Sequence, residues 1–141
     1  MNFIATLLVT NLLNISPADT NQYQLLVGSY TKKGNPGIEV YAVNAVTGKP
    51  SLLYTKENAN ASYLTLANEG KLMYAVSEGS KDASSVNSYK LNSNNEFEKI
   101  NNSAIKGAGP CFITYRSESK TVYTANYTSG SLSVFKTSED G

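Results

Sequence analysis

The 141-residue sequence contains no histidine, no tryptophan and a single cysteine, Cys111. One cysteine cannot form an intrachain disulfide, and without histidine a zinc site would have to be built from carboxylates alone. The missing histidine also removes the commonest general base and any Ser-His or Cys-His nucleophile pair. We therefore expect no structural metal, and we expect Cys111 to be a small buried residue rather than a reactive thiol.

The chain also lacks a strong charge of either sign. Its 12 basic and 11 acidic side chains nearly cancel, which leaves a formal net charge of +1. No run of Lys or Arg builds the electrostatic footprint that a phosphate backbone requires. Nucleic acid is therefore not an expected partner.

Long hydrophobic runs are absent as well. The apolar stretch from Phe3 to Ile15 is too short to span a membrane and is interrupted by Asn11 and Asn14. Residues 1–22 fit either a signal peptide or a disordered arm. The apolar stretch favours a signal peptide, but a signal peptide normally has a Lys or Arg before this stretch, and none is present here. The first alternative implies a periplasmic or secreted protein, and the second a cytoplasmic one.

What the sequence does contain is a repeat. The stretch YLTLANEGKLMYAVSE (63–78) aligns without a gap with FITYRSESKTVYTANY (112–127). Ten tyrosines and short runs rich in Val, Thr and Ser favour strands, and the apolar positions alternate with a period of two instead of 3.6. Four short strands in a repeat of about 48 residues are typical of a β-propeller blade. The expected fold class is all-β, a propeller of four-stranded blades.

We name the strands of a blade A to D from the central axis outward. Residues 23–141 then form a partial propeller: blade one has strands B to D (23–56), blade two is complete (61–102), and blade three has strands A to C (110–136). Because these ends cannot close a ring, we expect the N-terminal part of a longer protein. The alternative is a short chain whose copies assemble into a ring through the open strand edges.

The segments GSYT, GIEVY, TGK, ASYLTLANEGKLMYAVSE and GAGPCFITYRSESKTVYTANYTSGSLSVFKTSEDG resemble the lactonase family of seven-bladed propellers. That family includes the propeller-type 6-phosphogluconolactonases and the fungal carboxy-muconate lactonising enzymes. The resemblance covers residues 23–141, and its most specific part is A-N-Y-x-S-G-S-x-S-V-F (125–135). Seven blades would need about 340 residues.

The resemblance implies that the full-length parent hydrolyses a sugar lactone, first of all 6-phosphogluconolactone, without a cofactor or metal. In relatives, His- and Arg-containing segments of the pocket lie downstream of the position of Gly141, and the position of Phe112 is often histidine. The resemblance therefore implies that these residues alone are inactive. A non-enzymatic propeller that binds a carbohydrate or a protein is the alternative, because one fold hosts many functions.

The B-to-C and D-to-A loops of a propeller surround the mouth of its central channel. Tyr30, Glu78 and Tyr127 occupy equivalent positions at the ends of three B strands. Glu78 is the candidate catalytic residue, as a base or a hydroxyl anchor, although a solvated loop acid is the plainer interpretation. Tyr30 and Tyr127 are candidates to bind sugar hydroxyls, although packing between blades would explain them equally well.

Three further substrate-binding candidates come from the same loops. Lys32 follows Tyr30 and could bind a phosphate as a point charge, or be a solvated surface lysine. Ser62 and Asn126 could donate to an oxyanion, or cap the local turns.

Overall fold

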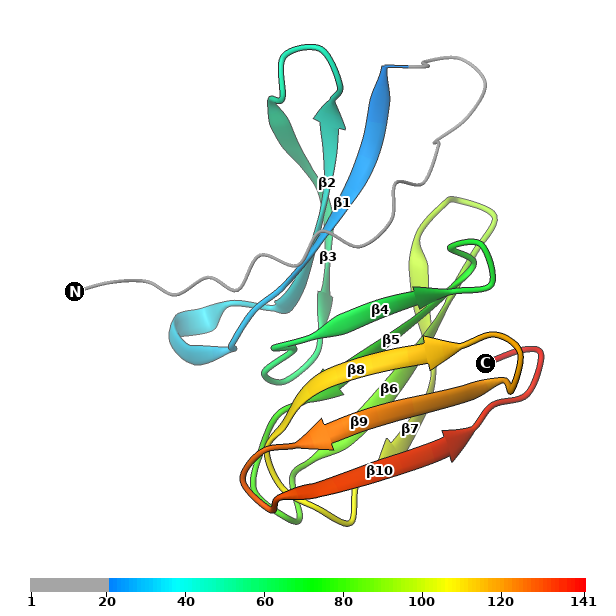
Figure 1. Ribbon diagram of the computed structural model, residues 1–141. Helices are drawn as coiled ribbons and strands as arrows, with labels where there is room; N and C mark the ends of the chain where they lie inside the picture. Colours follow the sequence, from blue (N-terminus) through cyan, green and yellow to red (C-terminus); the bar gives the residue numbers. More distant parts are fainter. Residues whose placement is uncertain (1–20) are drawn as a thin grey trace.

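The structure is a computed structural model that describes residues 21–141 (Figure 1). The expectation of a signal peptide or arm at residues 1–22 falls almost entirely outside this range. Within the range, no helix combines the length and apolar character needed to cross a membrane. The described chain forms three antiparallel sheets in succession.

Each sheet is a meander in which strands adjacent in sequence pair with each other. The first sheet contains β1 (Gln22–Gly28), β2 (Gly37–Asn44) and β3 (Pro50–Glu57), with the 3-10 turn η1 (Lys32–Gly34) between β1 and β2. The second contains β4 (Leu64–Ala67), β5 (Leu72–Ser77), β6 (Ser85–Leu91) and β7 (Phe97–Ala104). The third contains β8 (Pro110–Arg116), β9 (Thr121–Asn126) and β10 (Ser131–Lys136).

Successive sheets of this kind are consecutive blades, so the expected all-β propeller class is confirmed. The two A strands, β4 and β8, contact each other and lie side by side in Figure 1. The B strands of the three blades are β1, β5 and β9. The residues that follow them are therefore brought to the same end of the blades.

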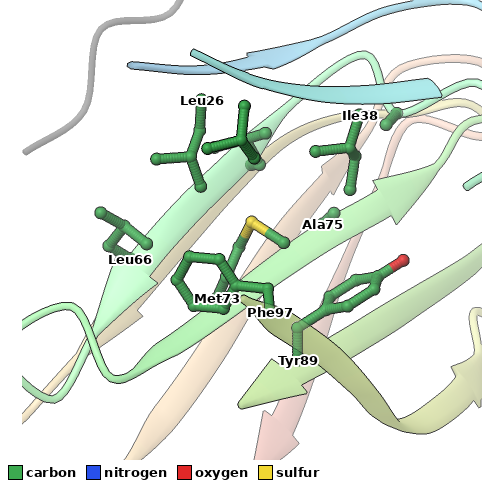
Figure 2. Packing of buried hydrophobic residues seen from close by; sticks show 10 residues of the cluster. Leu26, Ile38, Leu66, Met73, Ala75, Tyr89 and Phe97 are labelled. Atoms are coloured by element: carbon green, nitrogen blue, oxygen red, sulfur yellow. The ribbon is translucent and has the colours of Figure 1, made fainter. Parts of the chain in front are cut away.

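Two apolar clusters hold the blades together. The cluster between blades one and two is shown in Figure 2 and includes Leu26, Ile38, Met73, Tyr89 and Phe97. The cluster between blades two and three is made of Ala67, Leu72, Tyr74, Val76, Val86, Ile105, Ile113 and Val122. Each cluster contains residues from two neighbouring sheets. The apolar face of each sheet is therefore buried by packing against the next sheet.

A buried polar contact accompanies the first cluster. Asn58 donates from Nδ2 to the Val76 carbonyl at 2.9 Å, and the Tyr89 hydroxyl donates to Asn58 Oδ1 at 2.9 Å. A side chain at Gly37, where φ is +105°, would collide with the Asn58 carbonyl. Glycine at this position therefore allows the start of β2 to approach Asn58 closely.

Cys111 is exposed, so the expectation of a buried cysteine is wrong. The reason is a register irregularity in β8: Pro110 pairs with Asn126 and Phe112 with Ala125, which leaves Cys111 as the extra residue of a bulge. A bulged residue is unpaired and can turn its side chain away from the regular alternation.

Replacing Tyr89 by Phe should destabilise the fold by about 1–3 kcal/mol, because Asn58 Oδ1 would be left buried without the hydroxyl that donates to it. The loss should appear as a lower midpoint in urea unfolding. Tyr127→Phe is the matched control, since Tyr127 is 84% exposed. Equal midpoints for the two variants would contradict a role for the Tyr89 hydroxyl between the blades.

Candidate functional site

The loops that follow the B strands meet the loops that precede the A strands at one end of the blades. Glu78 donates its backbone N–H to the Asn60 carbonyl at 3.0 Å, and Tyr127 donates to the Gly109 carbonyl at 2.8 Å. The two bonds are equivalent in consecutive blades. This shared geometry brings together three of the predicted site residues, Tyr30, Glu78 and Ser62.

The centre of the site is a hydrogen bond between blades one and two. The Tyr30 hydroxyl donates to Glu78 Oε2 at 2.7 Å across 48 residues of sequence. Tyr30 is 45% exposed and Glu78 is half-buried, so the pair is open to a ligand. Glu78 Oε1 accepts no hydrogen bond from residues 21–141 and remains available for a water or a hydroxyl.

The electrostatics of this pair keep the phenol protonated. Burial, the hydrogen bond to Glu78 and the charge of Glu78 together raise the pKa of Tyr30 to about 12. The nearby Ser62 hydroxyl acts in the opposite direction on this pKa. Tyr30 is therefore a neutral donor at any physiological pH, and Glu78 is the acceptor.

Ser62 adds a second polar group beside the pair. Its Oγ is buried and forms no regular hydrogen bond with any described residue, although it lies near the Tyr30 phenol. A buried hydroxyl without a partner has a cost, which a ligand oxygen or a water could relieve. The site thus offers a carboxylate oxygen that accepts, with the buried Ser62 hydroxyl beside the Tyr30 phenol.

Sequence reasoning missed Asn60. This residue has a positive φ of +48°, and its side chain bonds to both Thr31 and Glu78. The gapless alignment of Tyr63 with Phe112, extended backward by three residues, pairs Asn60 with Gly109. Glycine at one copy of a position indicates a special backbone conformation at the other, and that signal could have identified Asn60.

The remaining predicted residues lie outside the pair. Tyr127 is 84% exposed, and Lys32 is exposed in η1. Asn126 is buried: Nδ2 donates to the hydroxyls of Ser131 and Ser133, and Oδ1 accepts from Thr124. An amide engaged in this way serves the local structure, and its role toward a ligand stays a prediction.

Within residues 21–141, no group of three or more His, Cys, Asp or Glu side chains is placed to hold a metal ion. The groups that the site does present are a carboxylate, a phenol and a hydroxyl. These groups suit recognition of a polyhydroxylated molecule or activation of a water.

The sheets and the site define a class of protein: a β-propeller whose B-strand ends and D-to-A loops form a polar mouth. The sequence matches the family described as Lactonase, 7-bladed beta-propeller over residues 24–141. The chain belongs to this family.

Individual relatives agree with this assignment. The chain is 33% identical over 119 residues to a 6-phosphogluconolactonase of Bacillus subtilis (strain 168), covering 82% of this chain and 33% of the relative. A crystal structure from Bacteroides fragilis NCTC 9343, of a candidate 6-phosphogluconolactonase, is 34% identical with a TM-score of 0.82, covering 90% of this chain and 35% of that one. A periplasmic gluconolactonase of Pseudomonas aeruginosa is 27% identical with a TM-score of 0.78, covering 85% and 36%. The chain spans about one third of the length of the curated relatives it matches.

Replacing Glu78 by Gln should lower the pKa of Tyr30 from about 12, because the charge and the carboxylate acceptor are lost. Burial is the largest cause of the shift and would remain, so the pKa should stay above 10.0. The measurement is the ultraviolet absorbance of the phenolate against pH, with Tyr30→Phe in each background to isolate this tyrosine. An unchanged titration would show that Glu78 does not hold the phenol.

The same shift predicts a pH dependence of stability. A pKa raised on folding means that the native state favours the protonated phenol, so this contribution is complete below pH 10 and is lost as the pH rises through about 12. Tyr30→Phe should therefore reduce the fall in stability between pH 10 and 12. A fall as steep as in the unmodified protein would contradict this prediction.

Proposed function

We propose that the protein hydrolyses a sugar lactone, with 6-phosphogluconolactone as its substrate and 6-phosphogluconate as its product. The observation that carries this proposal is the 33% identity over 119 residues to a 6-phosphogluconolactonase. The same name belongs to a second relative, from Formosa agariphila, which is also 33% identical. Because the chain spans about one third of these relatives, the proposal concerns the activity of the whole protein.

Lactone hydrolysis sets clear chemical requirements. A water adds to the carbonyl carbon, the ring C–O bond breaks, and the proton of the water ends on the leaving alkoxide or in the solvent. The step needs a base for the water and donors for the oxyanion that forms on the carbonyl oxygen. A phosphate on the sugar also needs cations to hold it.

Glu78 meets the first requirement best among the described residues. Tyr30 occupies Oε2, which leaves Oε1 to accept a proton from water or a hydrogen bond from a sugar hydroxyl. The Ser62 hydroxyl, without a regular partner, is the candidate donor to a substrate oxygen. Lys32 is the candidate cation for the phosphate. It lies in blade one, whereas Glu78 lies in blade two.

The negative charge of Glu78 also orients the substrate. A carboxylate repels a phosphate, so the hydroxyl-bearing part of the sugar, and not the phosphate, should face the Tyr30–Glu78 pair. We propose that this mouth contributes the recognition of the sugar hydroxyls.

In the protein produced from its native gene, Glu78→Gln should reduce kcat/KM for 6-phosphogluconolactone. A role as base predicts a loss in kcat of on the order of 100-fold. A role as hydroxyl anchor predicts an increase in KM of about tenfold with kcat retained. A kinetic assay that separates kcat from KM decides between the two roles.

Glu69→Gln is the control for this variant. Glu69 is exposed in the turn between β4 and β5, at the opposite end of the blade, and loses the same charge. If both variants keep full activity, Glu78 has no part in the reaction even though the protein is a lactonase. If the unmodified protein does not open the lactone, the proposed substrate is wrong.

A further inference from the structure

We infer that Asn60 is the positioning residue of the Tyr30–Glu78 pair, which it holds in place by joining blade one to blade two beneath the mouth. The inference rests on the proposed function for what the pair does to a substrate. The positioning itself is a property of the described residues. No predicted site residue performs this task.

The Asn60 side chain bonds to both blades at once. Oδ1 accepts from the Thr31 backbone N–H at 3.2 Å and from the Thr31 hydroxyl at 3.1 Å. Nδ2 donates to the Glu78 carbonyl at 2.9 Å. Thr31 is the residue directly after Tyr30, so one amide group fixes the backbone beside both members of the pair.

The Asn60 backbone adds two more bonds to the same site. Its carbonyl accepts from the N–H groups of Glu78 at 3.0 Å and Ser62 at 2.8 Å. The positive φ of +48° at Asn60 accompanies this geometry, and asparagine tolerates that conformation better than most residues. Asn60 therefore bonds to Glu78 twice, to Ser62 directly, and to Thr31, the neighbour of Tyr30.

The next blade shows the same backbone without the clamp. Gly109 is equivalent to Asn60, has a φ of +64°, and its carbonyl accepts from Tyr127 N–H at 2.8 Å. Gly109 has no side chain, and it reaches the preceding blade only through its backbone N–H, which donates to the Gly79 carbonyl at 2.9 Å. No hydrogen bond within residues 21–141 joins the side chains of Glu78 and Tyr127, and Tyr127 is 84% exposed. The side-chain clamp and the ordered pair thus occur together in one blade junction and are both missing from the other.

The physical role is preorganisation. Water competes for the hydrogen bond between a half-exposed tyrosine and a half-buried carboxylate. Both side chains also lose rotamer freedom when the bond forms. If the backbone on both sides is fixed, less of that freedom remains to be lost when a ligand binds. A displacement of a reacting group by about 1 Å can cost about 100-fold in rate, so the clamp should matter for kcat/KM.

Asn60→Gly is the variant that tests this role. Glycine accepts the positive φ, and Gly109 shows that the carbonyl bond to the residue at the end of the B strand forms without a side chain, so the variant removes the side-chain clamp and keeps this bond. We expect the pKa of Tyr30 to fall from about 12 toward 10, and kcat/KM for the lactone to fall about tenfold or more.

Asn68→Gly is the matched control. Asn68 has a φ of +50°, lies exposed in the turn between β4 and β5, and undergoes the same chemical change far from the mouth. Both variants should be made in the protein produced from its native gene, and Tyr30→Phe in each background isolates the phenol titration. Thermal unfolding of both variants measures any general loss of stability.

The two readouts separate the inference from the proposed function. If Asn60→Gly keeps the Tyr30 titration near 12 and matches Asn68→Gly in kcat/KM, the positioning role is overturned while the lactonase remains. If the unmodified protein shows no lactonase activity, the proposed function fails, and the Tyr30 titration still decides the role of Asn60. A fall in the Tyr30 pKa in Asn60→Gly alone supports the clamp.

Discussion

Face-to-face packing of neighbouring blades is the constraint on which the rest of the structure depends. Strand β5 is buried along its whole length, because Met73 and Ala75 enter the first cluster while Tyr74 and Val76 enter the second. A single blade cannot bury two apolar faces by itself, so each blade requires its neighbours. The relative placement of the blades is therefore set by the cores, and the loops at their ends inherit it.

The candidate site follows from that placement. Tyr30 and Glu78 hold equivalent positions in adjacent blades, and packing of the blades brings equivalent positions close together. The chemistry comes from a difference between the repeats at this position: blade two has Glu78, whereas blades one and three have Tyr30 and Tyr127. A repeat of three tyrosines would leave the phenol without a carboxylate acceptor. Asn60 adds the second difference, because its counterpart Gly109 links blades two and three through its backbone alone and has no side chain to do so.

Much of the fold could be predicted from the sequence because it depends on patterns among residues that are close together in the chain. The period of about 48 residues and the two-residue alternation depend only on neighbouring positions, and equivalence between repeats correctly placed Tyr30 and Glu78 at one end. The hydrogen bond between them and the clamp by Asn60 depend on the distance between blades, which no local pattern encodes. Cys111 was mispredicted for a similar reason, since a bulge in β8 breaks the alternation on which the prediction relied.

The outward face of blade three shows how far the packing constraint extends. Leu132 and Val134 are 64% and 54% exposed, yet their equivalents in blade two, Val86 and Ser88, are buried under blade three. Phe112 contacts Tyr63 at 4.9 Å between ring centroids and is still 41% exposed. By equivalence with blade two, Leu132 and Val134 lie on the face that packs against a neighbouring blade in a seven-bladed propeller. The Tyr30–Glu78 pair, in contrast, lies at the junction of two described blades, so its geometry is set by contacts between described residues.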